Sequence, residues 1–398
     1  MPLPTRRSRP AKFSPANFES VVLLLQGGGA LGAYQAGVYE ALAEDDIHPN
    51  WLAGISIGAI NCAIIAGNPP KKRVERLRQF WELVTADRFC FAPNTTNLLQ
   101  PFEFLKPIEG DLARSVLSQV SAGLAMFQGV PGFFSPRFPA PWAYQTGALA
   151  GTSFYDAKGL EETLERLVDF DRINAKNEMR ISIGAVNVRS GNFAYFDSSN
   201  HVIRPKHIVA SGALPPAFPA VEIDGEHYWD GGVVSNTPLQ WVLDSIPRQN
   251  TLAFQVDLWN ARGELPGNVA QVETRRKEIQ YSSRTRAGTD SFKYAQRMRN
   301  AVASLLEKLP DELKDCEEAN ILRAVADRKV YNIIHLIYHA RNYEGHAKDY
   351  EFSRASMEAH WRAGYNDTRR TLRHLRIFGL PTNDEGVATF DLERDGRE

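Results

Sequence analysis

The stretch that decides the fold is WLAGISIGAI, residues 51–60. Its first half is a short apolar run typical of a buried strand, and its second half opens a longer apolar segment typical of a buried helix. Ser56 lies at the turn between them, with Gly54 and Gly58 two residues away on either side. This G-x-S-x-G pattern in a strand–turn–helix context predicts a nucleophile elbow, a sharp turn that exposes the serine hydroxyl.

A glycine-rich turn, GGGALG at residues 27–32, precedes the elbow and follows another short apolar strand. Gly32 falls in the first turn of the helix expected next. Successive N–H groups at Gly27, Gly28 and Gly29 can form a concave anion-binding site. Beside a nucleophilic serine, this turn is predicted to be an oxyanion hole for acyl transfer.

The same glycines leave other functions open. Gly27, Gly29 and Gly32 also satisfy the G-x-G-x-x-G fingerprint of dinucleotide binding, which requires an acidic residue at the end of the second strand. That strand ends without an acid, and Asp45 and Asp46 come too early, in the connecting loop. A nucleotide-binding protein that uses the glycine-rich loop is therefore an alternative function, and a catalytically idle scaffold is another.

The third motif is an aspartate before two glycines, Asp230-Gly231-Gly232. Upstream, two short strands flank Asp224-Gly225, the signature of a tight hairpin turn. Asp224 is therefore interpreted as a structural residue. Asp230 comes where the second strand of the hairpin ends, which makes it the candidate functional carboxylate.

The histidines do not complete a serine–histidine–acid triad. None of the nine follows a strand in a glycine-flanked loop, where a hydrolase of the usual α/β type places its histidine. In a dyad, an aspartate would take the serine proton directly, and partial burial would have to raise its basicity. His335 and His339 have helical spacing but lack the glutamate of H-E-x-x-H, so we expect no metal site and no cofactor.

Composition narrows the class of protein. The 398 residues carry a net charge of −1 and are 43% apolar, which predicts a globular chain without a nucleic-acid partner. Three widely spaced cysteines, Cys62, Cys90 and Cys316, exclude a disulfide scaffold and a four-cysteine zinc site. They indicate reduced thiols and a cytoplasmic location. No apolar run approaches the ~20 residues of a membrane span, so we expect a soluble protein with peripheral membrane contact at most.

Charge and composition divide the chain into parts. Residues 270–380 hold 21 basic and 15 acidic side chains, unlike the regions on either side, and a Gly- and Pro-containing linker lies near residue 265. The residues from 275 to 309 are expected to form one long helix, whereas those from 331 to 338 could form a helix or a buried strand. The predicted parts are a mobile basic tail (1–19), a catalytic domain (20–260), a helical extension (268–380) and an acidic tail (381–398).

An aromatic and proline-rich insertion occupies residues 85–152 of the catalytic domain. Such a segment suits a lid or the wall of an apolar pocket, although ordinary packing against the core is the alternative. As a lid or pocket wall, it would place Phe133, Phe134 and Trp142 beside the acyl site.

Taken in order, the three motifs resemble those of the patatin-like phospholipase family. The block ASGALPPAFP, residues 210–219, is also similar to the family's segment before its aspartate. The resemblance covers residues 20–245 and implies a three-layer α/β/α fold with a mostly parallel central sheet. It also implies lipid acyl-ester hydrolysis through an acyl-enzyme, with Ser56 as nucleophile and Asp230 as general base.

The resemblance extends to the residues around the dyad. It assigns the backbone of Gly27, Gly28 and Gly29 to the oxyanion hole. One departure is Leu31, where many members have Arg or Lys, and this difference bears on substrate preference. The C-terminal part resembles the helical extension of a bacterial subgroup, for which the family implies no function.

Overall fold

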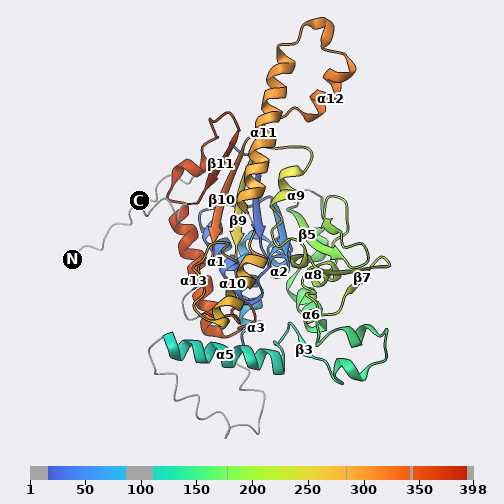
Figure 1. Cartoon of the computed structure of the whole chain (residues 1–398), viewed down its shortest axis with the longest axis vertical. Helices are drawn as coiled ribbons and strands as arrows, with labels where there is room; N and C mark the ends of the chain where they lie inside the picture. Colours follow the sequence, from blue (N-terminus) through green and yellow to red (C-terminus); the bar gives the residue numbers. More distant parts are fainter. Residues whose placement is uncertain (1–16, 87–110, 177, 284, 341–343, 392–398) are drawn as a thin grey trace, which may run out of the picture.

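The centre of the molecule is a nine-stranded sheet of order β11-β10-β9-β1-β2-β5-β8-β7, with β6 paired to β5 (Figure 1). The structure is a computed structural model, which describes residues 17–86, 111–176, 178–283, 285–340 and 344–391. The strands of this sheet are β1 (Ser20–Leu25), β2 (Trp51–Ile55), β5 (Arg180–Asn187), β6 (Phe193–Asp197), β7 (Val221–Ile223), β8 (Glu226–Asp230), β9 (Thr251–Asp257), β10 (Tyr331–Ile337) and β11 (Val387–Phe390).

The sheet is mostly parallel and is covered on both faces. The strands from β11 to β5 run parallel, whereas β6 and β8 are antiparallel to β5. Along β1, Leu23 and Leu25 join one buried cluster and Val22 and Leu24 join another. Because successive side chains of a strand point to opposite faces, a strand buried on both faces must be apolar throughout.

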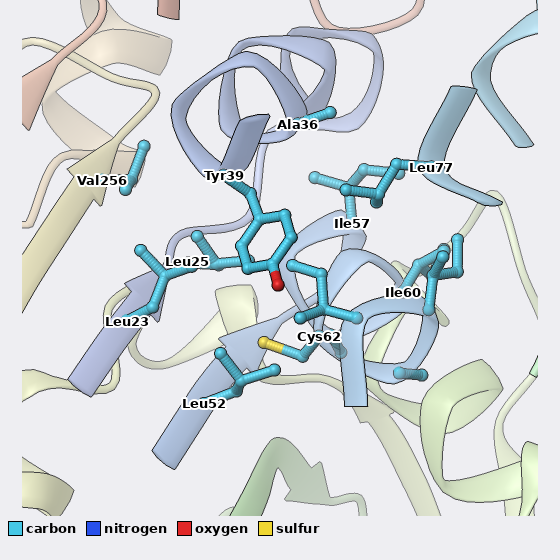
Figure 2. Close-up of a cluster of buried hydrophobic side chains, with 14 of the residues drawn as sticks. Leu23, Leu25, Ala36, Tyr39, Leu52, Ile57, Ile60, Cys62, Leu77 and Val256 are labelled. Carbon is cyan, nitrogen blue, oxygen red and sulfur yellow. The ribbon is translucent and has the colours of Figure 1, made fainter. Parts of the chain in front are cut away.

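Helices form the two outer layers. The cluster on one face takes residues from α1 (Ala33–Glu44), α2 (Ile57–Ala66), α3 (Pro70–Val84) and α13 (Arg354–Thr371), and part of it is drawn in Figure 2. The cluster on the other face takes residues from α9 (Leu239–Asp244) and α11 (Thr285–Glu307). The predicted three-layer α/β/α fold is confirmed.

The C-terminal extension is part of this fold and is not purely helical. Its strand β10 pairs with β9, and β11 pairs with β10, so the extension adds two parallel strands to the edge of the sheet. The segment whose structure the sequence left open is therefore a strand, and the predicted acidic tail contains β11. The single helix expected from residue 275 to 309 is wrong, because α10 (Val269–Tyr281) ends before α11 begins.

Helices α1 and α13 cross at two glycines. A Cβ on Gly37 of α1 would overlap the carbonyl oxygen of Trp361, and a Cβ on Gly364 of α13 would overlap that of Tyr34. The two backbones therefore touch where side chains would otherwise separate them. This contact fixes α13, which belongs to the extension, against a helix from the N-terminal part of the chain.

The remaining elements surround this core. Residues 87–110 of the insertion lie outside the described residues, as do 1–16 of the basic tail. In the described part of the chain, no helix is both long and apolar enough to cross a membrane. The other helices and strands are α5 (Asp111–Gln128), β3 (Ser135–Pro136), β4 (Tyr155–Asp156), α6 (Lys158–Leu167), α7 (Phe170–Ile173), α8 (Pro205–Ser211) and α12 (Glu317–Val325).

Candidate active site

Ser56 occupies a strained turn between β2 and α2. Its φ of 56° and ψ of −125° lie in a backbone region that residues other than glycine rarely adopt. This conformation has a cost of order 1–3 kcal/mol. A Cβ on Gly54 would lie 2.5 Å from the carbonyl carbon of Gly58, and one on Gly58 would overlap the carbonyl oxygen of Leu25. Both motif glycines are therefore required for the elbow to close.

A serine that the sequence analysis did not single out supports the elbow. The Ser56 N–H donates to Ser211 Oγ at 2.9 Å, and Ser211 Oγ donates to the carbonyl oxygen of Gly184 at 2.7 Å. Ser211 is fully buried at the end of α8. In the sequence, Ser211 is indicated by its position in the block at residues 210–219, but the pattern of that block assigns no role to a single residue.

Asp230 and Ser56 come together across β5. Ile55 of β2 pairs with Gly184 of β5, and Asp230 of β8 pairs with Ala185 on the opposite side of β5. The Ser56 side chain lies close enough to the Asp230 carboxylate to lower its pKa. The structure thus brings together two residues that lie far apart in the sequence.

The Asp230 carboxylate is buried, with 2% of the residue exposed. Burial raises its pKa to about 7, against the opposing effects of the nearby Ser56 side chain and of the Gly232 N–H, which donates to Asp230 Oδ1 at 2.7 Å. A carboxylate with this pKa is a much stronger base than an exposed aspartate and is still partly ionised near neutral pH.

The glycines after Asp230 are required by close packing. A Cβ on Gly231 would lie 2.9 Å from the carbonyl oxygen of Gly184, and one on Gly232 would lie 3.1 Å from Asp230 Oδ1. A side chain at Gly231 would therefore require a shift against the backbone of β5, and one at Gly232 would crowd Asp230 Oδ1. Within the described residues, which include all nine histidines, no hydrogen bond joins a histidine to Ser56 or Asp230.

The glycine-rich turn lies directly beside Ser56. A Cβ on Gly27 would be 3.0 Å from Ser56 Cβ and would overlap the Asn236 side chain, and one on Gly28 would be 2.7 Å from Leu258. Among the described residues, the N–H groups of Gly28 and Gly29 have no hydrogen-bond acceptor. These two backbone donors follow Gly27 in the turn and can hydrogen-bond a substrate oxygen on which negative charge develops.

The start of the turn is held by side chains that the sequence analysis missed. The carbonyl oxygen of Gly27 accepts hydrogen bonds from Trp259 Nε1 and Asn236 Nδ2, each at 2.9 Å. Asn236 Nδ2 also donates to the carbonyl oxygen of Tyr281 at 2.9 Å. The turn is therefore fixed by residues from after the aspartate motif and from α10, which no local pattern connects with it.

The helix after the glycine-rich turn packs tightly on the elbow. A Cβ on Gly32 would overlap Ile57, the first residue of α2. Gly32 also accepts a hydrogen bond from Asn61 Nδ2 through its carbonyl oxygen at 3.0 Å. The turn and the elbow are thus one packed unit.

Comparisons with known families agree with this geometry. A family model described as patatin-like phospholipase matches residues 23–243, more than half of the chain. The chain belongs to this family. A second model, described as patatin phospholipase, matches residues 279–384, so the C-terminal extension is itself a recognised patatin phospholipase region.

Individual relatives are more distant. A segment of 43 residues is 44% identical to the triacylglycerol lipase SDP1L of Arabidopsis thaliana, and this match spans 11% of the chain and 5% of that relative. VipD from Legionella pneumophila matches with a TM-score of 0.40 and 14% identity, covering 96% of this chain and 73% of VipD. ExoU from Pseudomonas aeruginosa, solved in complex with SpcU, matches with a TM-score of 0.24 and 13% identity, covering 92% and 75%. Both TM-scores are too low to support a shared fold by themselves.

Leu31, the departure from the family pattern, is fully buried in the core. It belongs to the cluster that includes Leu25 and Ile57, so an Arg or Lys could not replace it here without a change in its surroundings. At this position the chain therefore has apolar packing in place of a cation.

The described part of the insertion contacts the loop that leads to Asp230. Phe133 and Phe134 pack against Phe218, with ring centroids 6.4 Å and 5.4 Å away, and Phe133 is buried. Trp142 is 82% exposed, so it is not a buried wall of a pocket. The predicted lid stays a prediction, and its residues 87–110 lie outside the described residues.

Residues 17–86, 111–176, 178–283, 285–340 and 344–391 contain no cluster of His, Cys, Asp and Glu that could hold a metal ion. His335 and His339 do not share a helix face, because His335 lies in β10 and His339 lies beyond its end. Cys62 and Cys316 are free thiols, and Cys90 is outside the described residues.

Proposed function

We propose that this patatin-like chain is a serine acyl-ester hydrolase of lipid-like substrates. The observation that carries the proposal is that Ser56, held in a strained elbow, lies beside the buried carboxylate of Asp230. The unpaired N–H groups of Gly28 and Gly29 beside the serine support it. A nucleophile, a base and an anion site in contact are the three parts that acyl transfer requires.

In the first half of the reaction, Ser56 Oγ attacks the acyl carbon of the ester. Asp230 accepts the serine proton, and the electron pair of the C=O double bond moves onto oxygen. The backbone of Gly27, Gly28 and Gly29 provides the oxyanion hole, in which the N–H groups of Gly28 and Gly29 stabilise that oxygen. The intermediate collapses to an acyl-enzyme when the alcohol leaves with the proton from Asp230.

In the second half, water replaces the alcohol. Asp230 takes a proton from the water molecule, whose oxygen attacks the acyl carbon of the ester on Ser56. The new intermediate releases the fatty acid, and Ser56 Oγ regains its proton from Asp230. The raised pKa of Asp230 suits both directions, because the same group must accept and return a proton near neutral pH.

We also propose that the insertion makes peripheral contact with a lipid surface. Residues 115–155 contain a single charged residue, Arg137. Phe127, Phe138 and Trp142 are 82%, 96% and 82% exposed. Exposed aromatic side chains in a segment with so few charges are typical of a membrane–water interface. Figure 1 shows α5 and β3 together at one end of the molecule, where such contact would leave the other end free.

Labelling with a fluorophosphonate probe tests the hydrolase proposal. The wild-type chain and Ser235→Ala, which changes a serine of the loop after Asp230, should react, and Ser56→Ala should not. Equal labelling of Ser56→Ala would refute the nucleophile. A wild-type chain that neither reacts nor cleaves esters of any chain length would instead be an idle scaffold, or a nucleotide-binding protein if nucleotides raised its melting temperature. The cytoplasmic location stays a prediction, to be tested by cell fractionation.

A further inference from the structure

The C-terminal extension reaches the glycine-rich turn through Asp349. Gly29 has a φ of 55°, in the left-handed region, and a Cβ there would overlap the carbonyl oxygen of Asp349. The same oxygen accepts a hydrogen bond from the Ala30 N–H at 2.7 Å. A backbone carbonyl from the loop between β10 and α13 therefore lies directly on the turn beside Ser56.

The turn is thus held at both ends. Side chains of Trp259 and Asn236 bind the carbonyl oxygen of Gly27, and Asp349 binds the Ala30 N–H. The two N–H groups between these points, those of Gly28 and Gly29, are the ones without an acceptor in the described structure. The direction in which these two N–H groups point is set by the neighbouring peptide planes. It therefore depends on the contacts at both ends of the turn.

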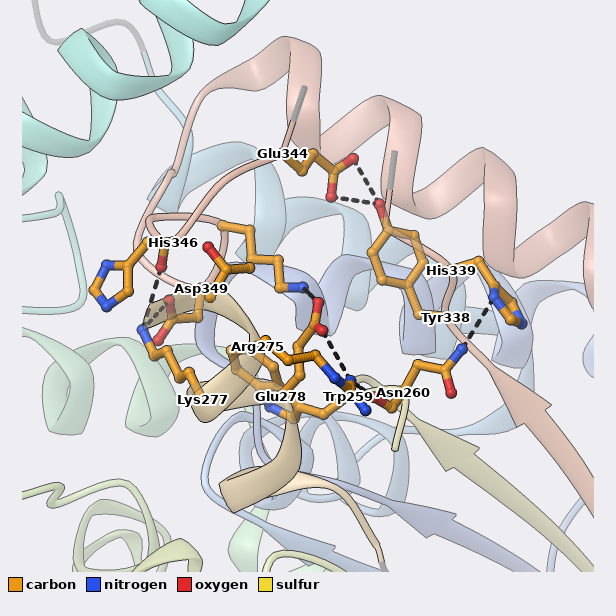
Figure 3. Close-up of polar contacts among 12 residues, drawn as sticks. Trp259, Asn260, Arg275, Lys277, Glu278, Tyr338, His339, Glu344, His346 and Asp349 are labelled. Carbon is orange, nitrogen blue, oxygen red and sulfur yellow. Dashed lines mark hydrogen bonds and ion pairs between the residues drawn. The ribbon is translucent and has the colours of Figure 1, made fainter. Parts of the chain in front are cut away.

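An ion pair fixes Asp349 in turn (Figure 3). Lys277 Nζ of α10 lies 2.5 Å from Asp349 Oδ1, and the two side chains are only 17% and 18% exposed. Lys277 also lies 5.1 Å from the ring centroid of Tyr350. A pair shielded from water to this degree is screened less by salt than a surface pair and holds a more defined geometry.

Tyr281 at the end of α10 shows that the same region borders the dyad. Its carbonyl oxygen accepts hydrogen bonds from Gln26, the residue before the turn, and from Asn236. The charges of Asp230 and Asp349 both act on its hydroxyl. The extension therefore approaches the turn and the base from one side.

We propose that Asp349 is a positioning residue for the oxyanion hole, held in place by Lys277 across the extension. The inference rests on the proposed hydrolase function. Oxyanion donors act in the transition state, so misplacing them should lower kcat and leave KM almost unchanged. Removing one donor outright costs about 10²–10³ in kcat, so loosening the turn should cost roughly tenfold.

The test compares Lys277→Met and Asp349→Asn with Lys277→Arg, which keeps the charge. Arg369→Met is the matched control, because its pair with Asp45 at 2.6 Å also involves the extension but does not touch the turn. We expect kcat to fall roughly tenfold in the first two variants, with KM within about twofold and with most activity kept in Lys277→Arg. An unchanged kcat, or an equal fall in Arg369→Met, would overturn the assignment.

Amide hydrogen exchange separates this inference from the proposed function. In Lys277→Met, peptides covering Gly27 to Leu31 should exchange faster than in the wild type, whereas Arg369→Met should not change them. This readout does not require turnover. If the wild type is inactive, the hydrolase proposal fails while exchange still tests the contact; if exchange is unchanged in Lys277→Met, the positioning role fails even in an active enzyme.

Discussion

Ser56 and Asp230 come from strands on opposite sides of β5, and the Ser56 side chain lies close enough to the Asp230 carboxylate to lower its pKa. In the described chain no hydrogen bond joins a histidine to either residue, and a direct proton transfer from Ser56 to Asp230 stays a proposal. The elbow at Ser56 carries backbone strain, and burial of Asp230 removes water from its carboxylate and raises its pKa. Replacing Ser56 should therefore change the free energy of unfolding, and replacing Asp230 should change how activity and stability depend on pH.

Ser56→Gly should be more stable than Ser56→Ala. At a φ of 56° a residue with a Cβ is strained by about 1–3 kcal/mol, whereas glycine adopts this region freely but loses ~0.5–1 kcal/mol in chain entropy. We expect the free energy of unfolding of Ser56→Gly to exceed that of Ser56→Ala by about 1 kcal/mol in urea titrations. Neither variant should hydrolyse esters, and equal stability would show that the elbow is not strained.

Asp230→Asn should be nearly as inactive as Ser56→Ala, a loss of roughly 10⁴-fold or more, because the amide keeps the shape but cannot accept a proton. In the wild type, kcat/KM should rise with pH and level off above a midpoint near 7, where Asp230 loses its proton. A pH–rate profile of a soluble ester checks this limb.

Histidine variants are the control for that assignment. A midpoint near 7 could also come from an imidazole, so the pH profile alone does not decide between a dyad and a triad. Each histidine replaced by Gln should keep most of the activity. A histidine variant as inactive as Ser56→Ala, with Asp230→Asn active, would convert the dyad into a triad. The nine positions are His48, His201, His207, His227, His335, His339, His346, His360 and His374.

Asp230→Asn should also change the pH dependence of stability. The folded state raises the pKa of Asp230 to about 7 from ~3.9 in the unfolded chain, so folding favours the protonated form. The stability from this proton is complete below pH ~4 and is lost as the pH rises through 7. Relative to wild type, the variant should therefore gain up to about 4 kcal/mol between pH 4 and pH 8. A constant difference in urea titrations across this range would contradict the raised pKa.

Gly37→Ala and Gly364→Ala should each destabilise the protein by about 2 kcal/mol or more, because the added methyl group has to separate α1 from α13. Gly288→Ala in α11 is the matched control, since its Cβ would meet nothing within 4 Å. That variant should be neutral or up to ~1 kcal/mol more stable, because alanine favours helices. Thermal unfolding of the three variants measures the difference.

Phe138→Ser with Trp142→Ser should weaken binding to phosphatidylcholine vesicles roughly tenfold or more, since each aromatic side chain would lose its contact with lipid. Hydrolysis of a soluble short-chain ester should be unchanged. Leu265→Ser is the control, because Leu265 is as exposed as Phe138, at 96%, but lies in the linker. Cosedimentation with the vesicles measures the binding of each variant. If the double variant bound as well as the wild type, the lipid contact would have to lie elsewhere on the protein.

Local patterns predicted the parts of the candidate site. The strand–turn–helix around Ser56, the glycine-rich turn and the hairpin before Asp230 are all encoded within short windows. The hairpin shows why: Asp224 and Gly225 have φ of 51° and 83°, the positive values that a tight turn requires and that Asp-Gly favours. Backbone conformations at such turns depend mainly on the residues in them.

The extension was predicted less well because its structure depends on distant partners. The segment after Val330 forms β10 because β9 offers an open edge, and its own pattern fits a helix or a strand. Helix α13 docks through Gly364 because α1 has Gly37 at the crossing, a match invisible in either helix alone. Such pairings can be predicted only when both contacting surfaces are known.

By itself, the sequence determined the α/β class and the turn at Ser56, and it made Asp230 the candidate carboxylate, because each depends on neighbouring residues. Only the tertiary structure decided the properties that depend on surroundings. It buried Asp230 and so raised its pKa to about 7, and it brought Asp349 onto the Ala30 N–H. Desolvation and long-range contact arise from chain segments far apart in sequence, and these meet only when the chain is folded.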